Sequence, residues 1–167
     1  MPARVPAAPS RAGTGAGSLL RRIATGAGTG YVPFASGTLG SLLGALLCFP
    51  LLYSLPWPVY LGATLLLTAL AVWAADRVAA DLGQPDPPQI VIDEIAGMWL
   101  AATALPPTLY DLTAVFLLFR FVDVVKPSPI PRLERLRGGL GIVADDVAAA
   151  LLARAMWWLL KANFDFL

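Results

Sequence analysis

The amino-acid sequence predicts an all-α fold, a polytopic membrane helical bundle of about five apolar helices behind a short N-terminal interfacial helix. Of the 167 residues, 57% are hydrophobic and 14% are charged, whereas soluble domains contain about 25% charged residues. The mean hydropathy of +0.70 agrees with this imbalance. The length fits one domain.

The chain divides into a polar beginning and a series of apolar segments. Residues 1–17 are rich in Ala, Pro, Gly and Arg and predict a disordered tail. Residues 18–167 predict a single helical membrane domain, in which residues 18–30 form the interfacial helix. Five apolar segments then follow, at residues 39–55, 59–75, 90–105, 109–125 and 142–160.

Prolines and basic residues predict the topology. Pro56 and Pro58 separate the first two segments, and Pro106 and Pro107 separate the third from the fourth, so each pair is expected to form a helical hairpin. These turns contain no Lys or Arg, whereas the tail and the longer connections contain several. The positive-inside rule therefore places the tail and the longer connections in the cytoplasm.

Composition excludes several classes of function. The chain has no histidine and one cysteine, Cys48. Histidine-dependent triads, histidine metal sites and intrachain disulfides are therefore excluded. The net charge of +1 argues against a nucleic-acid partner. Chemistry is left to carboxylates, hydroxyls, Lys, Arg and the backbone.

Acidic residues recur at one end of the apolar segments. Asp93 and Glu94 begin the third segment, Asp145 and Asp146 lie near the start of the fifth, and Asp123 lies near the end of the fourth. At about 1.5 Å per residue, the acids of the third and fourth segments lie about 20 Å from the outer helix ends. A charged residue at the bilayer centre costs about 2.5–3.5 kcal/mol. The pattern predicts a polar site at the cytoplasmic end, although acids at helix starts also act as caps.

Basic, hydroxyl and glycine residues complete the predicted site. Arg120 and Lys126 share a helix face with Asp123, which is also the pattern of an internal salt bridge. Lys and Arg bind phosphate. Further candidate phosphate-binding residues are Thr38, Ser41 and Gly139. The alternative interpretations are helix capping for the hydroxyls and a flexible loop for the glycines.

Several carboxylates beside two cations favour metal-assisted hydrolysis of a phosphate monoester. Mg²⁺ binds oxygen ligands and substrate phosphates. The candidate metal ligands are Asp93, Asp123, Asp145 and Asp146. Glu94 or one of these Asp residues is the candidate for positioning the attacking water, and a carboxylate nucleophile is the alternative.

Two other classes of function stay open. A small transporter of ions or anions would need a polar path to the outer face, where only Asp111 and Arg154 lie. A non-catalytic assembly partner would pack through Gly40 and Gly44, which form a Gly-x-x-x-Gly face. Packing is the favoured role of these two glycines.

Four motifs together resemble a known family. They are Gly37-Thr38-x-Gly40-Ser41, Asp93-Glu94-x-x-Gly97, Phe119-Arg120-x-x-Asp123-x-x-Lys126-Pro127-x-Pro129-Ile130 and Gly138-Gly139-x-Gly141-x-x-x-Asp145-Asp146. In order and spacing, the chain from about residue 30 to 155 resembles the phosphatidylglycerophosphatase A family of bacterial membrane phosphatases. It departs from the family at Ser36, where Pro is usual, and at Glu134, where Asp is expected.

The resemblance implies a membrane lipid phosphatase of phospholipid biosynthesis. It implies Mg²⁺-dependent conversion of phosphatidylglycerol phosphate to phosphatidylglycerol. It also implies a multi-pass protein of the bacterial inner membrane. With the predicted topology, the active site faces the cytoplasm.

Overall fold

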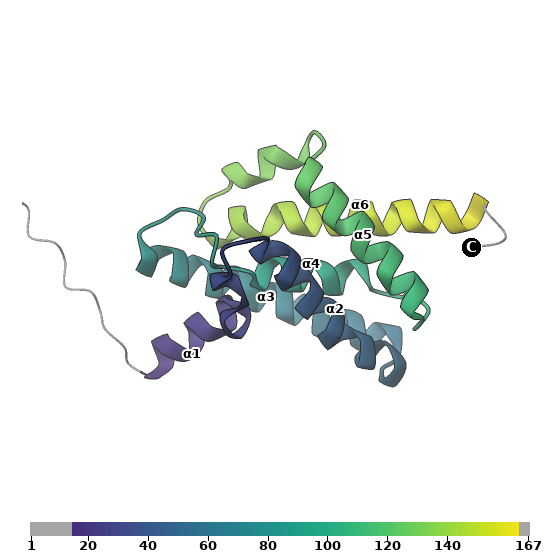
Figure 1. Ribbon diagram of the computed structural model, residues 1–167, viewed down its shortest axis with the longest axis horizontal. Helices are drawn as coiled ribbons and strands as arrows, with labels where there is room; N and C mark the ends of the chain where they lie inside the picture. The colour runs from purple at the N-terminus through teal and green to yellow at the C-terminus, as the bar shows by residue number, and fades with distance from the viewer. Residues whose placement is uncertain (1–14, 164–167) are drawn as a thin grey trace, which may run out of the picture.

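The computed structural model describes residues 15–163, and all regular structure within them is helical (Figure 1). The predicted all-α class is therefore confirmed. The elements are α1 (Gly15–Ala24), the 3₁₀ helix η1 (Gly26–Tyr31), α2 (Ser36–Ser54), α3 (Trp57–Leu82), α4 (Ile92–Ala101), α5 (Leu109–Val125), the 3₁₀ helix η2 (Ile130–Arg135) and α6 (Gly139–Asn163). Residues 1–14, which hold most of the predicted tail, lie outside the described residues, and α1 begins three residues before the predicted domain start.

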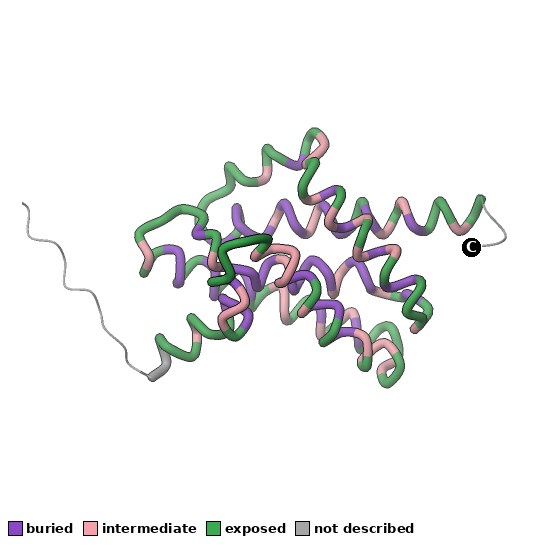
Figure 2. The backbone as a smooth tube through the Cα atoms, viewed as in Figure 1, coloured by how far each residue is buried: buried purple, intermediate pink, exposed green. Residues whose placement is uncertain are grey.

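The short helix α4 is the centre of the bundle. It contacts α2, α3, α5 and α6, while α1 packs on α3 and η2 packs on α6. Seven of the ten α4 residues are buried. In Figure 2 the buried parts of the chain concentrate where the helices cross, and the C-terminal end of α6 is mostly exposed. Groups on α4 are therefore held by four neighbouring helices.

Two glycines on α2 allow its close approach to α4. A Cβ atom on Gly40 would lie 2.8 Å from Cβ of Val91, and one on Gly44 would lie 3.1 Å from Cα of Ile95. Real Cβ atoms rarely approach other atoms this closely, so larger residues would separate the helices. The predicted packing role of the two glycines is confirmed.

Helix α3 is longer than the sequence predicts. Residues 76–82 were expected to belong to a polar connection, but the helix continues to Leu82. Val78 and Ala79 are buried in this last part, whereas Asp76 and Asp81 are exposed. The expectation was wrong because the apolar stretch ends before the helix does, and its last turns are amphipathic.

Helix α4 is shorter than the sequence predicts. A helix through residue 105 was expected, but α4 ends at Ala101. Arg154 of α6 donates hydrogen bonds to the carbonyl oxygens of Thr103 at 3.0 Å and Ala104 at 3.1 Å. This distant side chain satisfies the backbone of the turn. Ten residues extend about 15 Å, so α4 is too short to cross a hydrocarbon core of about 30 Å.

Among the described helices, α2 and α3 are long and apolar enough to cross a membrane. Only 28% of the apolar window of each helix is buried, unlike the core helix of a soluble protein. Exposed residues on α2 and α3 include Leu42, Leu46, Leu65 and Leu66. The structure supports two candidate spans; a third span at α4 is excluded by its length, and membrane crossing by α5 and α6 stays a prediction.

We predict that Gly44→Ala destabilises the bundle. The added methyl group meets the backbone of α4, and overpacking of this kind costs about 1–3 kcal/mol. The control is Gly62→Ala on α3, where a Cβ atom would meet nothing within 4 Å. Thermal unfolding in detergent should show a lower Tm for Gly44→Ala and no loss for Gly62→Ala. Equal Tm values would contradict the packing of α2 on α4.

Candidate active site

Five carboxylates from three helices lie near one another in the bundle. Asp93 and Glu94 belong to the first turn of α4, Asp123 to the last turns of α5, and Asp145 and Asp146 to α6. Asp93, Asp145 and Asp146 are buried, with exposed fractions of 8%, 6% and 3%. Buried carboxylates are costly unless they are paired or bind a metal ion. The five carboxylates therefore mark the candidate site.

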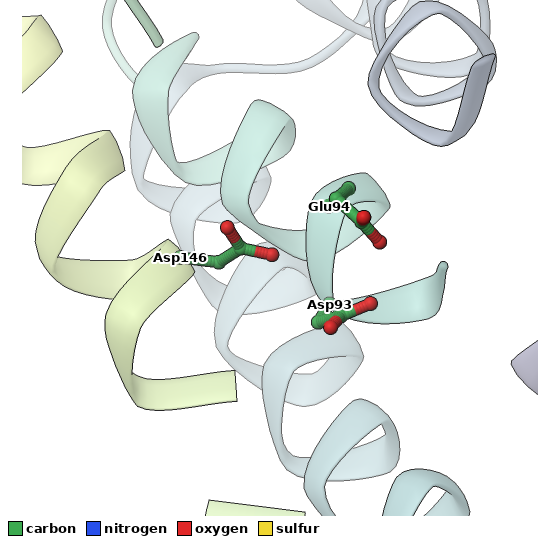
Figure 3. A group of neighbouring side chains, drawn as sticks. All are labelled: Asp93, Glu94 and Asp146. Atoms are coloured by element: carbon green, nitrogen blue, oxygen red, sulfur yellow. The ribbon is translucent and has the colours of Figure 1, made fainter. Parts of the chain in front are cut away.

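The five carboxylates form two overlapping groups. Asp93, Glu94 and Asp146 each offer an oxygen atom, and these atoms lie within 4.8 Å of one another; we call them the first triad. Asp123, Asp145 and Asp146 meet the same limit and form the second triad. In Figure 3, Asp146 projects from α6 toward the first turn of α4. The sequence predicted a single set of four acids, whereas the structure divides them around a shared Asp146.

Close packing at Gly97 brings α4 and α6 together at this point. A Cβ atom on Gly97 would lie 2.7 Å from Cζ of Phe119 and 3.3 Å from Cβ of Asp146. The absence of a side chain therefore lets Asp146 come close to α4, one turn above Asp93.

The two predicted cations bind acids of the second triad. Nη1 of Arg120 donates to Oδ2 of Asp123 at 2.7 Å, one helical turn away. Nζ of Lys126 donates to Oδ2 of Asp145 at 2.6 Å and to Oε1 of Glu134 at 2.5 Å. Burial disfavours the charged ammonium, but the two hydrogen-bonded carboxylates outweigh it and raise the pKa of Lys126 above its ordinary value. Lys126 therefore stays protonated at neutral pH.

The start of α2 also contacts the site. The Ser41 hydroxyl donates to the carbonyl oxygen of Gly37 at 2.8 Å and accepts from Nη1 of Arg120 at 3.3 Å. Thr38 is half-buried in the same first turn of the helix. A Cβ atom on Gly37 would lie 2.5 Å from Oε1 of Glu94 and 3.3 Å from Nη1 of Arg120. Gly37 therefore leaves room for two site residues.

Gly139 lies where α6 contacts α3. Its N–H donates to Oδ1 of Asp76 at 3.1 Å, and a Cβ atom on it would meet the carbonyl oxygen of Val72. Both contacts are with α3. The phosphate-binding role of Gly139 stays a prediction; in this structure its N–H has a carboxylate partner, and Gly139 joins α6 to α3.

Sequence reasoning missed Asp86 and left Glu134 outside the site. Glu134 lies in η2 and contacts Lys126. Partial burial, followed by the negative charge of Asp145, raises the pKa of Asp86 above its ordinary value. A cavity of about 600 Å³ opens beside them, with Asp86, Glu134 and Arg137 in its lining. No periodic sequence pattern distinguishes these residues. The one signal for Glu134 was its position as an acid among the basic residues between α5 and α6.

The acids have the free oxygen atoms that a metal site requires. Oδ1 of Asp93, Oε2 of Glu94 and Oδ1 of Asp145 are buried and have no hydrogen-bond partner among the described residues. Two unit charges about 4.8 Å apart repel by about 3–4 kcal/mol at an effective dielectric constant of about 20. A bound divalent cation would remove this repulsion and use the free oxygens. The residues therefore fit a metal ion with oxygen ligands.

Fold and site together define an all-helical protein with a buried carboxylate site that could hold divalent metal ions. The model of the phosphatidylglycerophosphatase A family matches residues 22–161. The chain therefore belongs to this family.

Individual relatives agree with the family model. The chain is 37% identical to phosphatidylglycerophosphatase A of Escherichia coli, over 78% of the chain and 77% of the relative. It is 38% identical to phosphatidylglycerophosphatase A of Haemophilus influenzae, over 80% and 83%. It is also 37% identical, over 81% and 92%, to a protein of Bacteroides thetaiotaomicron whose name carries a provisional phosphatidylinositol-3-phosphatase assignment. No solved structure matches the chain at a significant level.

We predict that Gly37→Ala lowers activity more than stability. The methyl group would displace the flexible ends of Glu94 and Arg120, not the backbone, so the fold can adjust while the site cannot. Misplacement by about 1 Å can reduce turnover about 10²-fold. Lipid phosphatase assays and thermal unfolding should be compared with those of Gly62→Ala, which retains both properties. Full activity in Gly37→Ala would contradict the placement of these groups.

Proposed function

We propose that the protein hydrolyses the terminal phosphate monoester of phosphatidylglycerol phosphate, giving phosphatidylglycerol and inorganic phosphate with the help of Mg²⁺. The observation that carries the proposal is the convergence of five carboxylates and two cationic side chains from three helices. Membership of the family, and the names of two of its relatives, support this substrate.

The metal ligands in this proposal are Asp93, Asp123, Asp145 and Asp146, whose oxygen atoms meet in the two triads. Mg²⁺ held by these residues would supply charge stabilisation to the phosphate and activation of the attacking water. Glu94 belongs to the first triad and has a buried free oxygen. It is suited to orient the attacking water and accept its proton. Direct attack by a carboxylate is the alternative.

The cationic side chains are suited to bind the phosphate. Nε of Arg120 is buried without a hydrogen-bond partner among the described residues, and its Nη1 contacts Ser41. Lys126 lies beyond the end of α5 and holds Asp145. Positive groups at these two positions would stabilise negative charge that develops on the leaving oxygen and the phosphate. Ser41 and Thr38 would add hydroxyl donors from α2.

The apolar exterior supports a membrane location. We propose that α2 and α3 cross the bacterial inner membrane and that the acids face the cytoplasm, as the distribution of Lys and Arg indicates. Exposed apolar residues also continue onto α5 and α6 and would contact lipid. The acyl chains of the substrate would then lie along the helices while its phosphate reaches the site.

The transporter alternative is weaker because its outer polar residues are already paired. Asp111 accepts from Nζ of Lys161 at 2.8 Å and from Nε1 of Trp157 at 3.0 Å. Arg154 donates to two carbonyl oxygens of the turn after α4. These contacts join helices to one another, and Asp111 lies about 18 Å along α5 from Asp123. The outer residues therefore have structural roles.

We predict that phosphate release requires a divalent cation. Purified protein in detergent should lose activity toward phosphatidylglycerol phosphate in excess EDTA and regain it with Mg²⁺, because the free oxygens of Asp93 and Asp145 would then be occupied. Phosphatidic acid and phosphatidylinositol 3-phosphate serve as competing substrates. Undiminished hydrolysis in EDTA would exclude the metal role, and preference for either competing lipid would exclude the proposed substrate.

We predict opposite effects for Asp146→Asn and Asp111→Asn. Asp146 belongs to both triads, so its loss should reduce turnover at least about 10²-fold, the effect of a positioned acid–base group, without lowering Tm. Asp111 pairs with Lys161, so its neutralisation should lower Tm and leave turnover of the folded protein unchanged. Near-normal turnover in Asp146→Asn would refute the site assignment.

A further inference from the structure

The two triads use one shared carboxylate. Asp146 meets Asp93 and Glu94 on one side and Asp123 and Asp145 on the other. A carboxylate has two oxygen atoms, so it can bind two metal ions at once. Metal ions in two-metal phosphatases lie about 3.5–4 Å apart, a separation that a bridging carboxylate can span.

Each triad has its own free and buried oxygen atom. Oδ1 of Asp93 in the first triad has no hydrogen-bond partner among residues 15–163, and neither has Oδ1 of Asp145 in the second. Both residues are more than nine-tenths buried, with exposed fractions of 8% and 6%. Lys126 occupies the other oxygen of Asp145 and leaves Oδ1 free. A single ion in either triad would leave the free oxygen of the other triad without a bound metal ion.

The charge balance also favours two ions. Six carboxylates, the five of the triads and Glu134, face two cationic side chains, Arg120 and Lys126, so four negative charges are uncompensated when all six acids are ionised. One divalent ion would leave a net charge of −2, and two would leave the site neutral. A negative site repels a phosphate anion, and the second ion would remove this repulsion.

We propose that the site binds two divalent metal ions bridged by Asp146, the first held by Asp93 and Glu94 and the second by Asp123 and Asp145. This inference rests on the proposed phosphatase function and adds the number and arrangement of the ions. It also replaces the water-orienting role of Glu94 with that of a metal ligand, which the sequence did not predict.

The test counts Mn²⁺ ions bound to the full-length protein in detergent. After removal of metals with chelator, bound Mn²⁺ is counted by equilibrium dialysis and elemental analysis, and electron paramagnetic resonance detects coupling between neighbouring ions. We expect two Mn²⁺ ions per chain and a spin-coupled spectrum. One ion per chain, or two ions with an uncoupled spectrum, would overturn the proposal.

Variants assign each ion to its triad. Glu94→Gln and Asp123→Asn should each reduce the binding affinity for one of the two ions about 10- to 100-fold, the effect of losing a metal-site partner. Each should also abolish the spin coupling between the ions. Asp146→Asn should weaken both ions. The control Asp81→Asn changes an exposed acid outside the triads and should retain two coupled ions. The assignment would be overturned if Glu94→Gln and Asp123→Asn, with unchanged Tm, bound both ions as tightly as the unsubstituted protein.

Phosphate release measured on the same samples separates this inference from the proposed function. Activity toward phosphatidylglycerol phosphate with only one bound ion would refute the two-ion site and retain the phosphatase. Two coupled ions without hydrolysis of any lipid phosphate would refute the phosphatase and retain the metal site.

Discussion

The structure depends on holding several carboxylates close together in the interior of the helical bundle. Carboxylates of α4, α5 and α6 approach within 4.8 Å of one another in each triad, where each pair of ionised groups repels by about 3–4 kcal/mol at an effective dielectric constant of about 20. Arg120 and Lys126 compensate for part of this repulsion in the second triad. Because no ion pair involves Asp93 or Glu94 among the described residues, the first triad depends most on an added cation.

The short central helix makes this arrangement feasible. Helix α4 begins at the level of the acids, ends after ten residues and is enclosed by four longer helices. Its first turn therefore presents Asp93 and Glu94 to α6 without a long span of its own. Glycines at the contacts with α2 and α6 let the backbones approach closely. Side chains from separate helices can then bind one metal ion. The residues that pack the helices thus determine the geometry of the carboxylate site.

Much of this architecture could be predicted from local sequence patterns. Hydropathy and the proline pairs gave the α5 segment with the observed bounds, and the positions of the acids at helix ends indicated that Asp93, Asp123 and Asp146 lie at similar depth. Patterns failed where a distant partner decides the outcome. Arg154 completes the turn that ends α4, and Asp76 takes the N–H of Gly139. Neither contact leaves a mark in the nearby sequence.

The division of the acids into two triads also required three dimensions. The sequence predicted Asp145 and Asp146 as ligands of one metal site, although adjacent residues on a helix point about 100° apart. The structure directs Asp146 toward both groups and Asp145 toward Lys126. Asp146 is consequently the residue on which the account of the site depends.

Anomalous diffraction from crystals grown with Mn²⁺ tests this account most directly, because it locates the metal without reference to activity. The account predicts anomalous density between α4 and α6, at a bonding distance of about 2.0–2.3 Å from the carboxylate of Asp146. Mn²⁺ bound only elsewhere on the protein, with the carboxylate of Asp146 free of metal, would contradict it.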